Sequence, residues 1–218
     1  MLKTDRYKKV TAWFAKNMAD AQTELHYHTT FQLLVAVVLS AQCTDKRVNM
    51  VTPALFAQMG TPEMMAQASV DEIFAYISSV SYPRAKATHL SQSAKLLVEE
   101  FDSEVPSTRI ELETLPGVGR KTASVILSVA FGQNEMAVDT HVHRVANRIG
   151  LTKNARTPLE TEKQLVDGLK NQDLGKAHHW LILHGRYICT ARSPHCQQCG
   201  IAEYCAYFCE QKKIVATK

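Results

Sequence analysis

Apolar residues recur along most of this chain at the three- and four-residue spacing of an α-helix. Between residues 5 and 17, for example, Val10, Trp13 and Phe14 fall on one helical face. The segment from Phe31 to Gln42 is apolar on nearly all sides. Such a pattern predicts a helix that is buried at the centre of a domain.

The same pattern predicts further helices, which are separated by proline, serine or glycine. The sequence Thr61-Pro62-Glu63 is typical of a helix start, because threonine caps a helix and proline suits its first position. The other expected helices span residues 71–78, 85–101, 121–131, 139–149, 158–169 and 177–189. No segment before Cys189 has the convincing alternation of a β-strand. We therefore expect an all-α fold made of many short helices.

Composition and charge set only broad limits on function. The 218 residues, 45% of them hydrophobic, suffice for one large folded domain or two small ones. The net charge of +4 permits an anionic partner without requiring one. The first residues contain no apolar signal segment, and the longest apolar run, Leu33 to Leu39, is too short to span a bilayer. We therefore expect a soluble, cytoplasmic protein that has no membrane partner.

A glycine-rich turn precedes the helix expected at residues 121–131. Its sequence is Leu115-Pro116-Gly117-Val118-Gly119-Arg120-Lys121-Thr122-Ala123. Gly117 and Gly119 permit the close approach of another backbone, and the N–H groups of a helix start favour an anion such as phosphate. Lys121 would lie in the first turn of that helix, where its amine could attack a nucleic-acid backbone or its sugar.

Two interpretations of this turn remain open on the pattern alone. One is a helix-hairpin-helix that clamps nucleic acid. The other is an ordinary helix C-cap followed by a new helix, with the lysine exposed to solvent. A nucleotide-binding P-loop is excluded, because it needs four residues between its first glycine and Gly-Lys, and a strand upstream. Here Arg120 separates Gly119 from Lys121, and residues 110–115 look helical.

Asp139, at the start of the helix expected at residues 139–149, is the candidate partner of Lys121. The helix between the two residues returns the chain to the same end of a bundle, so both side chains could face one cleft. A lysine is nucleophilic only when deprotonated, a state that nearby cations and partial burial favour. A simpler interpretation is that Asp139 caps its helix. We expect the neighbouring His141 and His143 to pack or to bind phosphate.

Cysteines are concentrated near the carboxyl end. Five of the six occur in the last thirty residues, namely Cys189, Cys196, Cys199, Cys205 and Cys209. In the cytoplasm, such a group indicates metal binding or free thiols rather than disulfides. The first four have the spacing Cys-x6-Cys-x2-Cys-x5-Cys, which can enclose one metal centre. Tetrahedral zinc and a [4Fe–4S] cluster both fit this spacing, and Cys209 is expected to be spare.

Four segments in order resemble the endonuclease III family, the bifunctional DNA glycosylase/AP lyases of the helix-hairpin-helix superfamily. They are Leu39-Ser40-Ala41-Gln42-Cys43-Thr44-Asp45, the glycine-rich turn at residues 115–123, Ala137-Val138-Asp139-Thr140-His141-Val142, and His179-Trp180-Leu181-Ile182-Leu183-His184-Gly185-Arg186. The four-cysteine spacing is the one that this family uses for a [4Fe–4S] cluster. The resemblance runs from about residue 22 to residue 209. It favours iron–sulfur over zinc.

This resemblance implies a two-lobed, all-α molecule with DNA between the lobes. Residues 23–133 would form a six-helix barrel that carries the hairpin. Residues 1–22 and 134–218 would form a second lobe with the iron–sulfur cluster, held by Cys189, Cys196, Cys199 and Cys205. The expected partner is double-stranded DNA with damaged pyrimidines or abasic sites, bound by a monomer that associates with a bacterial nucleoid.

The resemblance also implies roles for individual residues. Lys121 would be the amine nucleophile and Asp139 the carboxylate that assists its attack at the sugar C1′. Gln42 would fill the space left by the flipped base, and Tyr82 would be a wedge beside it, although the family usually has glycine where Ser81 stands. The other expected DNA contacts are Gly117, Gly119, His141, Arg144, Arg186 and Arg192.

Two alternative functions share some of these features. An adenine-specific glycosylase of the same superfamily has the cluster, but that family lacks a lysine at position 121 and carries an additional carboxy-terminal domain. A non-catalytic iron–sulfur protein that binds DNA or transfers electrons is the other alternative. Ferredoxins, however, have tighter cysteine spacings and no pair like Lys121 and Asp139.

Overall fold

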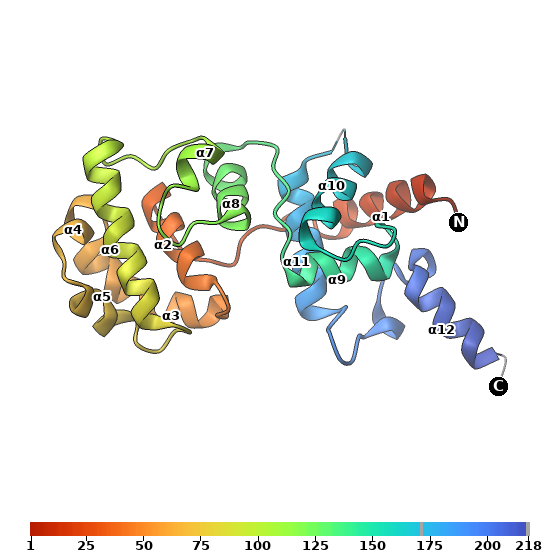
Figure 1. Cartoon of the computed structure of the whole chain (residues 1–218). Helices are drawn as coiled ribbons and strands as arrows, with labels where there is room; N and C mark the ends of the chain where they lie inside the picture. Colours follow the sequence, from red (N-terminus) through yellow and green to blue (C-terminus); the bar gives the residue numbers. More distant parts are fainter. Residues whose placement is uncertain (171, 217–218) are drawn as a thin grey trace. The chain divides into compact units, whose positions relative to one another are not determined.

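The computed structural model describes residues 1–170 and 172–216 (Figure 1). Throughout these residues the regular secondary structure is helical, which confirms the all-α prediction. The chain divides into two compact units. Residues 23–133 form one, called here the hairpin unit, and residues 1–22 with 134–218 form the other, called the cysteine unit. In the described part of the chain, no helix combines the length and the hydropathy that a membrane span requires.

The hairpin unit is built around one apolar helix. Its helices are α2 Thr30–Ser40, α3 Asp45–Met59, α4 Pro62–Gln67, α5 Val70–Ile77, α6 Pro83–Glu100, α7 Arg109–Leu112 and α8 Arg120–Phe131. Helix α2 packs against α3, α6 and α8, because every side chain from Leu33 to Leu39 is apolar and buried. Helices α4 and α5 pack against α6, and α7 packs against α8. The predicted DNA contacts of this unit lie at ends of these helices, Gln42 after α2, Tyr82 at the start of α6, and Gly117 and Gly119 before α8.

The cysteine unit joins the first helix of the chain to the last ones. Its helices are α1 Lys3–Asn17, α9 Thr140–Ile149, α10 Pro158–Gly168, α11 Leu174–Tyr187, the short 3-10 turns η1 Cys196–Gln198 and η2 Ala202–Tyr204, and α12 Ala206–Ala216. Helix α9 packs against α10, α11 and α12. Phe14 of α1 stacks on Trp180 of α11, with ring centroids 5.9 Å apart. The hydroxyl of Tyr7 donates to the carbonyl of Leu151 at 2.8 Å, so α1 is part of this core.

The structure corrects the predicted helices in two respects. Helices α3 and α12 were not expected; α3 contains Pro53 within it, and α12 follows a segment without clear apolar periodicity. Helix α2 ends at Ser40 instead of continuing to Gln42, which has a φ of 54°. The physical reason is that the ammonium group of Lys86 binds carbonyls at the end of α2 and so terminates the helix.

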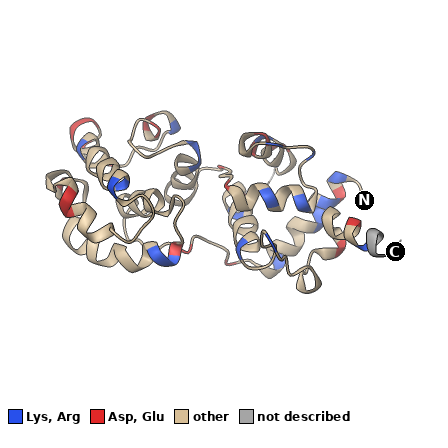
Figure 2. Ribbon diagram, turned by 60° about the horizontal axis from the view of Figure 1, so that its bottom comes forward, with Lys and Arg blue, Asp and Glu red and all other residues tan. Residues whose placement is uncertain are grey.

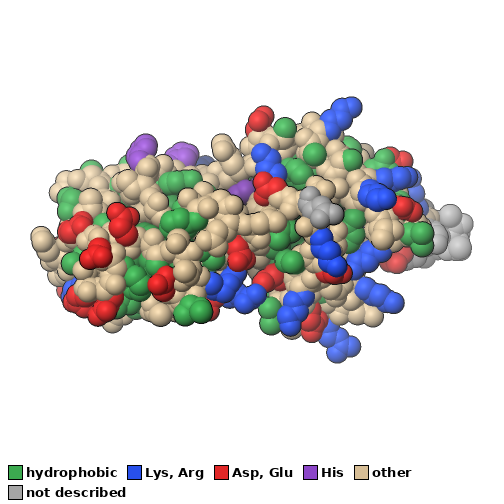
Figure 3. Space-filling model, turned by 90° about the horizontal axis from the view of Figure 1, so that it is seen from above, with side chains coloured by type: hydrophobic (Ala, Val, Ile, Leu, Met, Phe, Trp, Pro, Cys, Tyr) green, Lys and Arg blue, Asp and Glu red, His purple; other side chains and the backbone are tan. Residues whose placement is uncertain are grey.

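Charge is divided unequally between the two units. Residues 23–133 contain 8 Lys and Arg against 11 Asp and Glu, whereas the rest of the chain contains 17 against 10. Figure 2 shows these charges along the ribbon, and in Figure 3 Lys and Arg gather over the unit that carries the chain termini. An anionic partner would therefore be attracted mainly by the cysteine unit.

Candidate functional site

The glycine-rich turn connects α7 to α8 and is held from two sides. The guanidinium group of Arg109 in α7 donates to the carbonyl of Arg120 at 3.3 Å and to the hydroxyl of Ser124 at 3.0 Å. The hydroxyl of Ser93 in α6 donates to the carbonyl of Pro116 at 2.8 Å. These bonds hold α7, the turn and α8 together. They favour a helix-hairpin-helix over a simple C-cap followed by an independent helix.

The two glycines of the turn serve different purposes. Gly117 has a φ of +83°, and a Cβ at this position would lie 3.1 Å from atoms of His89 in α6. Gly119 has an ordinary φ of −102°, and a Cβ built there would have no atom within 4 Å. The fold therefore requires glycine at position 117 but not at position 119. The space beside Gly119 is open at the start of α8.

Helix α8 begins without a side-chain cap, because Gly119 is its N-cap residue. Several other helices begin with a Ser, Thr or Asp side chain that accepts an N–H of the first turn; they are α2, α3, α4, α5, α7, α9, α10 and α11. A helix start without such a cap is suited to an anionic ligand, since first-turn N–H groups and the helix dipole favour negative charge. Lys121 is the second residue of α8 and is partly buried.

Asp139 is the N-cap residue of α9. Its Oδ1 accepts the backbone N–H of Val142 at 2.8 Å, as the simpler interpretation of this residue predicts. The bond orients the carboxylate and occupies one of its oxygens, so capping is compatible with a second role. Lys121 belongs to the hairpin unit and Asp139 to the cysteine unit.

Gln42 and Tyr82 are neighbours within the hairpin unit. Both residues have a φ of 54°, and both side chains are exposed, that of Tyr82 by 65%. The hydroxyl of Ser81 donates to the carbonyl of Gln42 at 2.5 Å and thereby joins the two turns. A left-handed backbone is uncommon at non-glycine residues, and it is also found here at Asp102, Ser103 and Asn154. The feature specific to Gln42 and Tyr82 is the bond from Ser81 that joins their turns.

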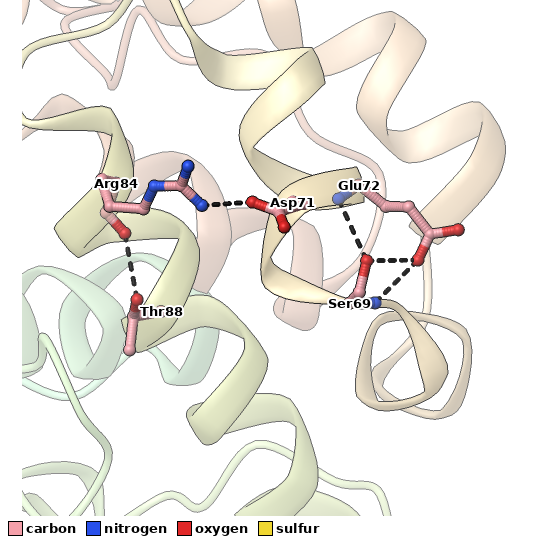
Figure 4. Close-up of polar contacts among 5 residues, drawn as sticks. All are labelled: Ser69, Asp71, Glu72, Arg84 and Thr88. Atoms are coloured by element: carbon pink, nitrogen blue, oxygen red, sulfur yellow. Dashed lines mark hydrogen bonds and ion pairs between the residues drawn. The ribbon is translucent and has the colours of Figure 1, made fainter.

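The start of α6, directly after Tyr82, is also held by α5 (Figure 4). Arg84 forms an ion pair with Asp71, and its guanidinium group lies 4.5 Å from the ring centroid of Phe74. The side chains of Ser69 and Glu72 form a capping box that fixes the start of α5. These contacts hold the backbone from which Tyr82 projects.

Arg144, a predicted DNA contact, has structural partners within the cysteine unit. Its guanidinium group donates to the carbonyls of Gly185 at 2.8 Å and Cys189 at 3.1 Å. The same group lies 3.3 Å from Nδ1 of His141, another predicted contact. Arg144 therefore holds the end of α11 and the first candidate cysteine ligand. A direct contact of Arg144 or His141 with DNA stays a prediction.

Arg186 and Arg192 lie on either side of Cys189 in the sequence. Arg186 is partly buried in the last turn of α11, and Arg192 is exposed in the loop that follows. His143, for which packing or phosphate binding was expected, has its Nδ1 2.7 Å from the hydroxyl of Thr161 in α10, so it packs inside the unit. The predicted DNA contacts of the two arginines stay predictions.

Four cysteines line a single hollow in the cysteine unit: Cys189, Cys196, Cys199 and Cys205. The hollow is partly open to solvent. The rest of its wall is largely apolar and includes Ile149, Ile188, Pro194, Ile201 and Phe208. Cys209 is exposed and does not belong to this lining. The structure thus brings together the four cysteines that the sequence singled out.

Four thiols around one apolar hollow can together hold a metal centre. In an iron–sulfur cluster, several iron and sulfide ions would lie between four such thiolates.

Burial also affects the protonation of these thiols. Burial raises the pKa of Cys199 to about 11, and the neighbouring thiols add to the effect. Burial likewise raises the pKa values of Cys196 and Cys205 above that of an ordinary thiol. Iron would therefore have to displace protons on binding.

Two residues beside the cysteines were not predicted from the sequence. A guanidinium nitrogen of Arg148 lies 3.6 Å from Sγ of Cys189, and the group also donates to the carbonyls of Thr190 and Ala191. Nε2 of His184 lies 3.7 Å from Sγ of Cys199. Arg148 could have been found from the sequence, because it lies one helical turn after Arg144 and so on the same face of α9.

Comparisons with known proteins agree on one family. The family of HhH-GPD superfamily base excision DNA repair proteins matches residues 35–171, and the iron-sulfur binding domain of endonuclease III matches residues 189–205. The endonuclease III of Rickettsia conorii is 48% identical over 200 residues, which cover 92% of this chain and 95% of that protein.

Two solved structures have the same fold. One is a trapped covalent intermediate of endonuclease III with DNA, 40% identical, with a TM-score of 0.91 over 97% of this chain and 100% of that chain. The other is a non-covalent endonuclease III–DNA complex, 39% identical, with a TM-score of 0.92 over 98% and 100%. Because these matches include the hairpin, both units and the four cysteines, this chain belongs to the endonuclease III family of base excision repair DNA glycosylase/AP lyases and contains the iron–sulfur binding domain of that family.

Proposed function

We propose that this protein removes oxidised pyrimidines from duplex DNA and then cuts the strand at the resulting abasic site. The observation that carries the proposal is the start of α8. This helix has no side-chain cap, and Lys121 is its second residue. A backbone phosphate bound at this helix start would place the adjoining sugar near an amine. DNA as the partner is supported by the two solved endonuclease III structures, which are complexes with DNA.

In the proposed reaction, the damaged base is first turned out of the duplex, because its glycosidic bond cannot be reached inside the stack. The neutral amine of Lys121 attacks C1′, the bond from C1′ to the base breaks, and the base leaves with a proton. Opening of the sugar ring gives a Schiff base between Nζ and C1′. Loss of a C2′ proton then expels the 3′ phosphate. Asp139 would stabilise the positive charge that develops or accept a proton.

Other residues would bind and open the duplex. We propose that Gln42 fills the gap left by the flipped base and that Tyr82 is the wedge beside it. Gly117 and Gly119 would bring backbone N–H groups to phosphates. The cysteine unit would supply positive charge to the rest of the DNA backbone through Arg186 and Arg192. His141 and Arg144 are the other DNA contacts proposed in this unit. We expect the enzyme to act as a monomer.

Cys189, Cys196, Cys199 and Cys205 would hold a [4Fe–4S] cluster in the apolar hollow. When bound, such a cluster links its cysteine segments covalently through iron and can exchange an electron. The steps of strand cleavage described above use only side chains and solvent. The proposed part of the cluster in this enzyme is therefore to hold the loop that contains Arg192.

Replacement of Lys121 by alanine should abolish the covalent product that borohydride traps on abasic DNA. Borohydride reduces a Schiff base to a stable amine, so the loss of the amine removes the adduct. Gel analysis would measure the adduct, and Lys95→Ala, at an exposed lysine of α6, is the matched control. An adduct of undiminished yield with Lys121→Ala would assign the nucleophile to another amine.

Asp139→Asn should lower turnover by orders of magnitude and leave the melting temperature almost unchanged. The asparagine oxygen can still accept the N–H of Val142, so the cap of α9 is retained while the charge is lost. Single-turnover kinetics and thermal unfolding would measure the two effects separately. Lower stability with near-normal turnover per folded molecule would instead limit Asp139 to capping.

The two glycines of the turn should respond differently to alanine. At Gly119 the side chain has open space, so Gly119→Ala should cost less than about 1 kcal/mol in unfolding free energy. If a phosphate approaches here, the methyl group should raise the Kd for duplex DNA about tenfold, or ~1.4 kcal/mol. Gly117→Ala should instead destabilise the fold by about 1–3 kcal/mol, because its φ is left-handed. Unchanged DNA affinity in Gly119→Ala would place the phosphate elsewhere.

Purified protein should be yellow-brown and contain about four iron atoms per chain, as expected for a [4Fe–4S] cluster. Serine at position 189, 196, 199 or 205 should remove most of the iron, because each thiolate is proposed as a ligand. Cys209→Ser is the matched control, since Cys209 is exposed outside the hollow. Iron analysis and visible absorbance would measure the outcome. Stoichiometric zinc in a colourless, active preparation would contradict the assignment.

A further inference from the structure

Lys86 of α6 is a buried lysine that the proposed reaction does not use. Its side chain is only 5% exposed, and it shares the buried face of α6 with Ala87, Leu90, Ala94 and Leu97. A lysine is almost never buried unless its ammonium group has partners, because the charge loses its hydration. The contacts of Lys86 therefore explain why the residue lies there.

The partners of the ammonium group are two carbonyls at the end of α2. Nζ of Lys86 donates to the carbonyl of Leu39 at 2.8 Å and to that of Ala41 at 2.7 Å. The last carbonyls of a helix lack N–H partners within the helix and lie at the negative end of its dipole. One cation satisfies both groups. The chain then leaves the helix, and the next residue, Gln42, adopts its left-handed conformation.

The second turn of this pair belongs to the same helix as Lys86, because Tyr82 is the N-cap residue of α6, one helical turn before it. The hydroxyl of Ser81, next to Tyr82, donates to the carbonyl of Gln42 at 2.5 Å. The side chains of Lys86 and Ser81 thus connect the start of α6 to the turn that contains Gln42, and the ion pair of Arg84 with Asp71 of α5 contacts the first turn of α6 (Figure 4).

We propose that Lys86 is a positioning residue for the opening of the duplex. It holds Gln42 and Tyr82 at a fixed separation, so that both side chains enter the DNA at the same base step. The inference rests on the roles proposed above for these two residues. A neutral side chain at position 86 would leave the carbonyls of Leu39 and Ala41 without their donor. The turn would then relax, and Gln42 would move away from Tyr82.

The test compares cutting of an abasic site in a duplex with cutting of the same site in a single strand. A single strand has no opposite base to support and no stack to open, so gap filling and wedging matter only in the duplex. We expect Lys86→Met to lower kcat/KM for the duplex about ten- to a hundredfold, the effect of a misplaced group. Cutting of the single strand should stay near the wild-type rate.

Three further variants make the result specific. Lys95→Met, at an exposed lysine on the same helix, should leave both rates unchanged. Lys86→Arg, which keeps a charged donor, should recover part of the duplex rate. Ser81→Ala removes only the bond to Gln42 and should lower the duplex rate in the same direction; it provides the test if Lys86→Met does not fold. A purely structural role would lower both rates together.

Gln42→Ala and Tyr82→Ala separate the possible failures. If these two variants lower the ratio of duplex to single-strand cutting while folded Lys86→Met and Ser81→Ala leave it at the wild-type value, the positioning role is wrong and the proposed roles of Gln42 and Tyr82 stand. If none of the four variants changes the ratio, the roles proposed for Gln42 and Tyr82 are wrong, and the inference about Lys86 is overturned with them.

Discussion

The need to satisfy the ends of helices governs this structure. A fold made of short helices has many ends, and each end exposes backbone N–H or C=O groups that the helix itself cannot pair. Most helix starts are capped locally by Ser, Thr or Asp, as Thr44 caps α3 and Asp139 caps α9. Helices α1, α6 and α8 start without such a cap, and the end of α2 is bound by the distant side chain of Lys86. The uncapped starts of α6 and α8 and the end of α2 lie beside predicted DNA contacts.

The helices that could be predicted are those in which local signals agree. Thr61 and Pro62 start α4 as expected, because the cap and the first-turn proline both depend on neighbouring residues only. Helix α3 was not predicted, and it contains Pro53, a residue that is unfavourable inside a helix. It forms because Val48, Thr52, Leu55 and Met59 make a buried stripe at helical spacing, and their packing outweighs the lost hydrogen bond. Packing of this kind is decided by the tertiary structure.

The candidate site shows the same limit. The hairpin glycines, Lys121 and the four cysteines could be found because each belongs to a short motif with a definite chemical purpose. Lys86 could not be found in this way, since its carbonyl partner Leu39 is 47 residues away in the sequence. The only local signal was a lysine on the apolar face of α6. Arg144 shows the limit in another way, because a sequence does not reveal that its guanidinium group binds the carbonyl of Cys189.

Two kinds of interaction hold the segment that contains the four cysteines, residues 189–205. Only one of them depends on iron. Arg148 binds the carbonyls of Thr190 and Ala191 and thus fixes the start of the segment to α9 through the protein alone. The later part, around Cys199 and Cys205, faces an apolar hollow. Burial raises the pKa values of these thiols, so iron displaces their protons on binding and links them only while the cluster is present. Loss of the cluster should therefore loosen the later part of the segment while Arg148 still restrains the start. Arg192 lies just after that restrained start, so its position depends both on the hydrogen bonds of Arg148 and on the cluster.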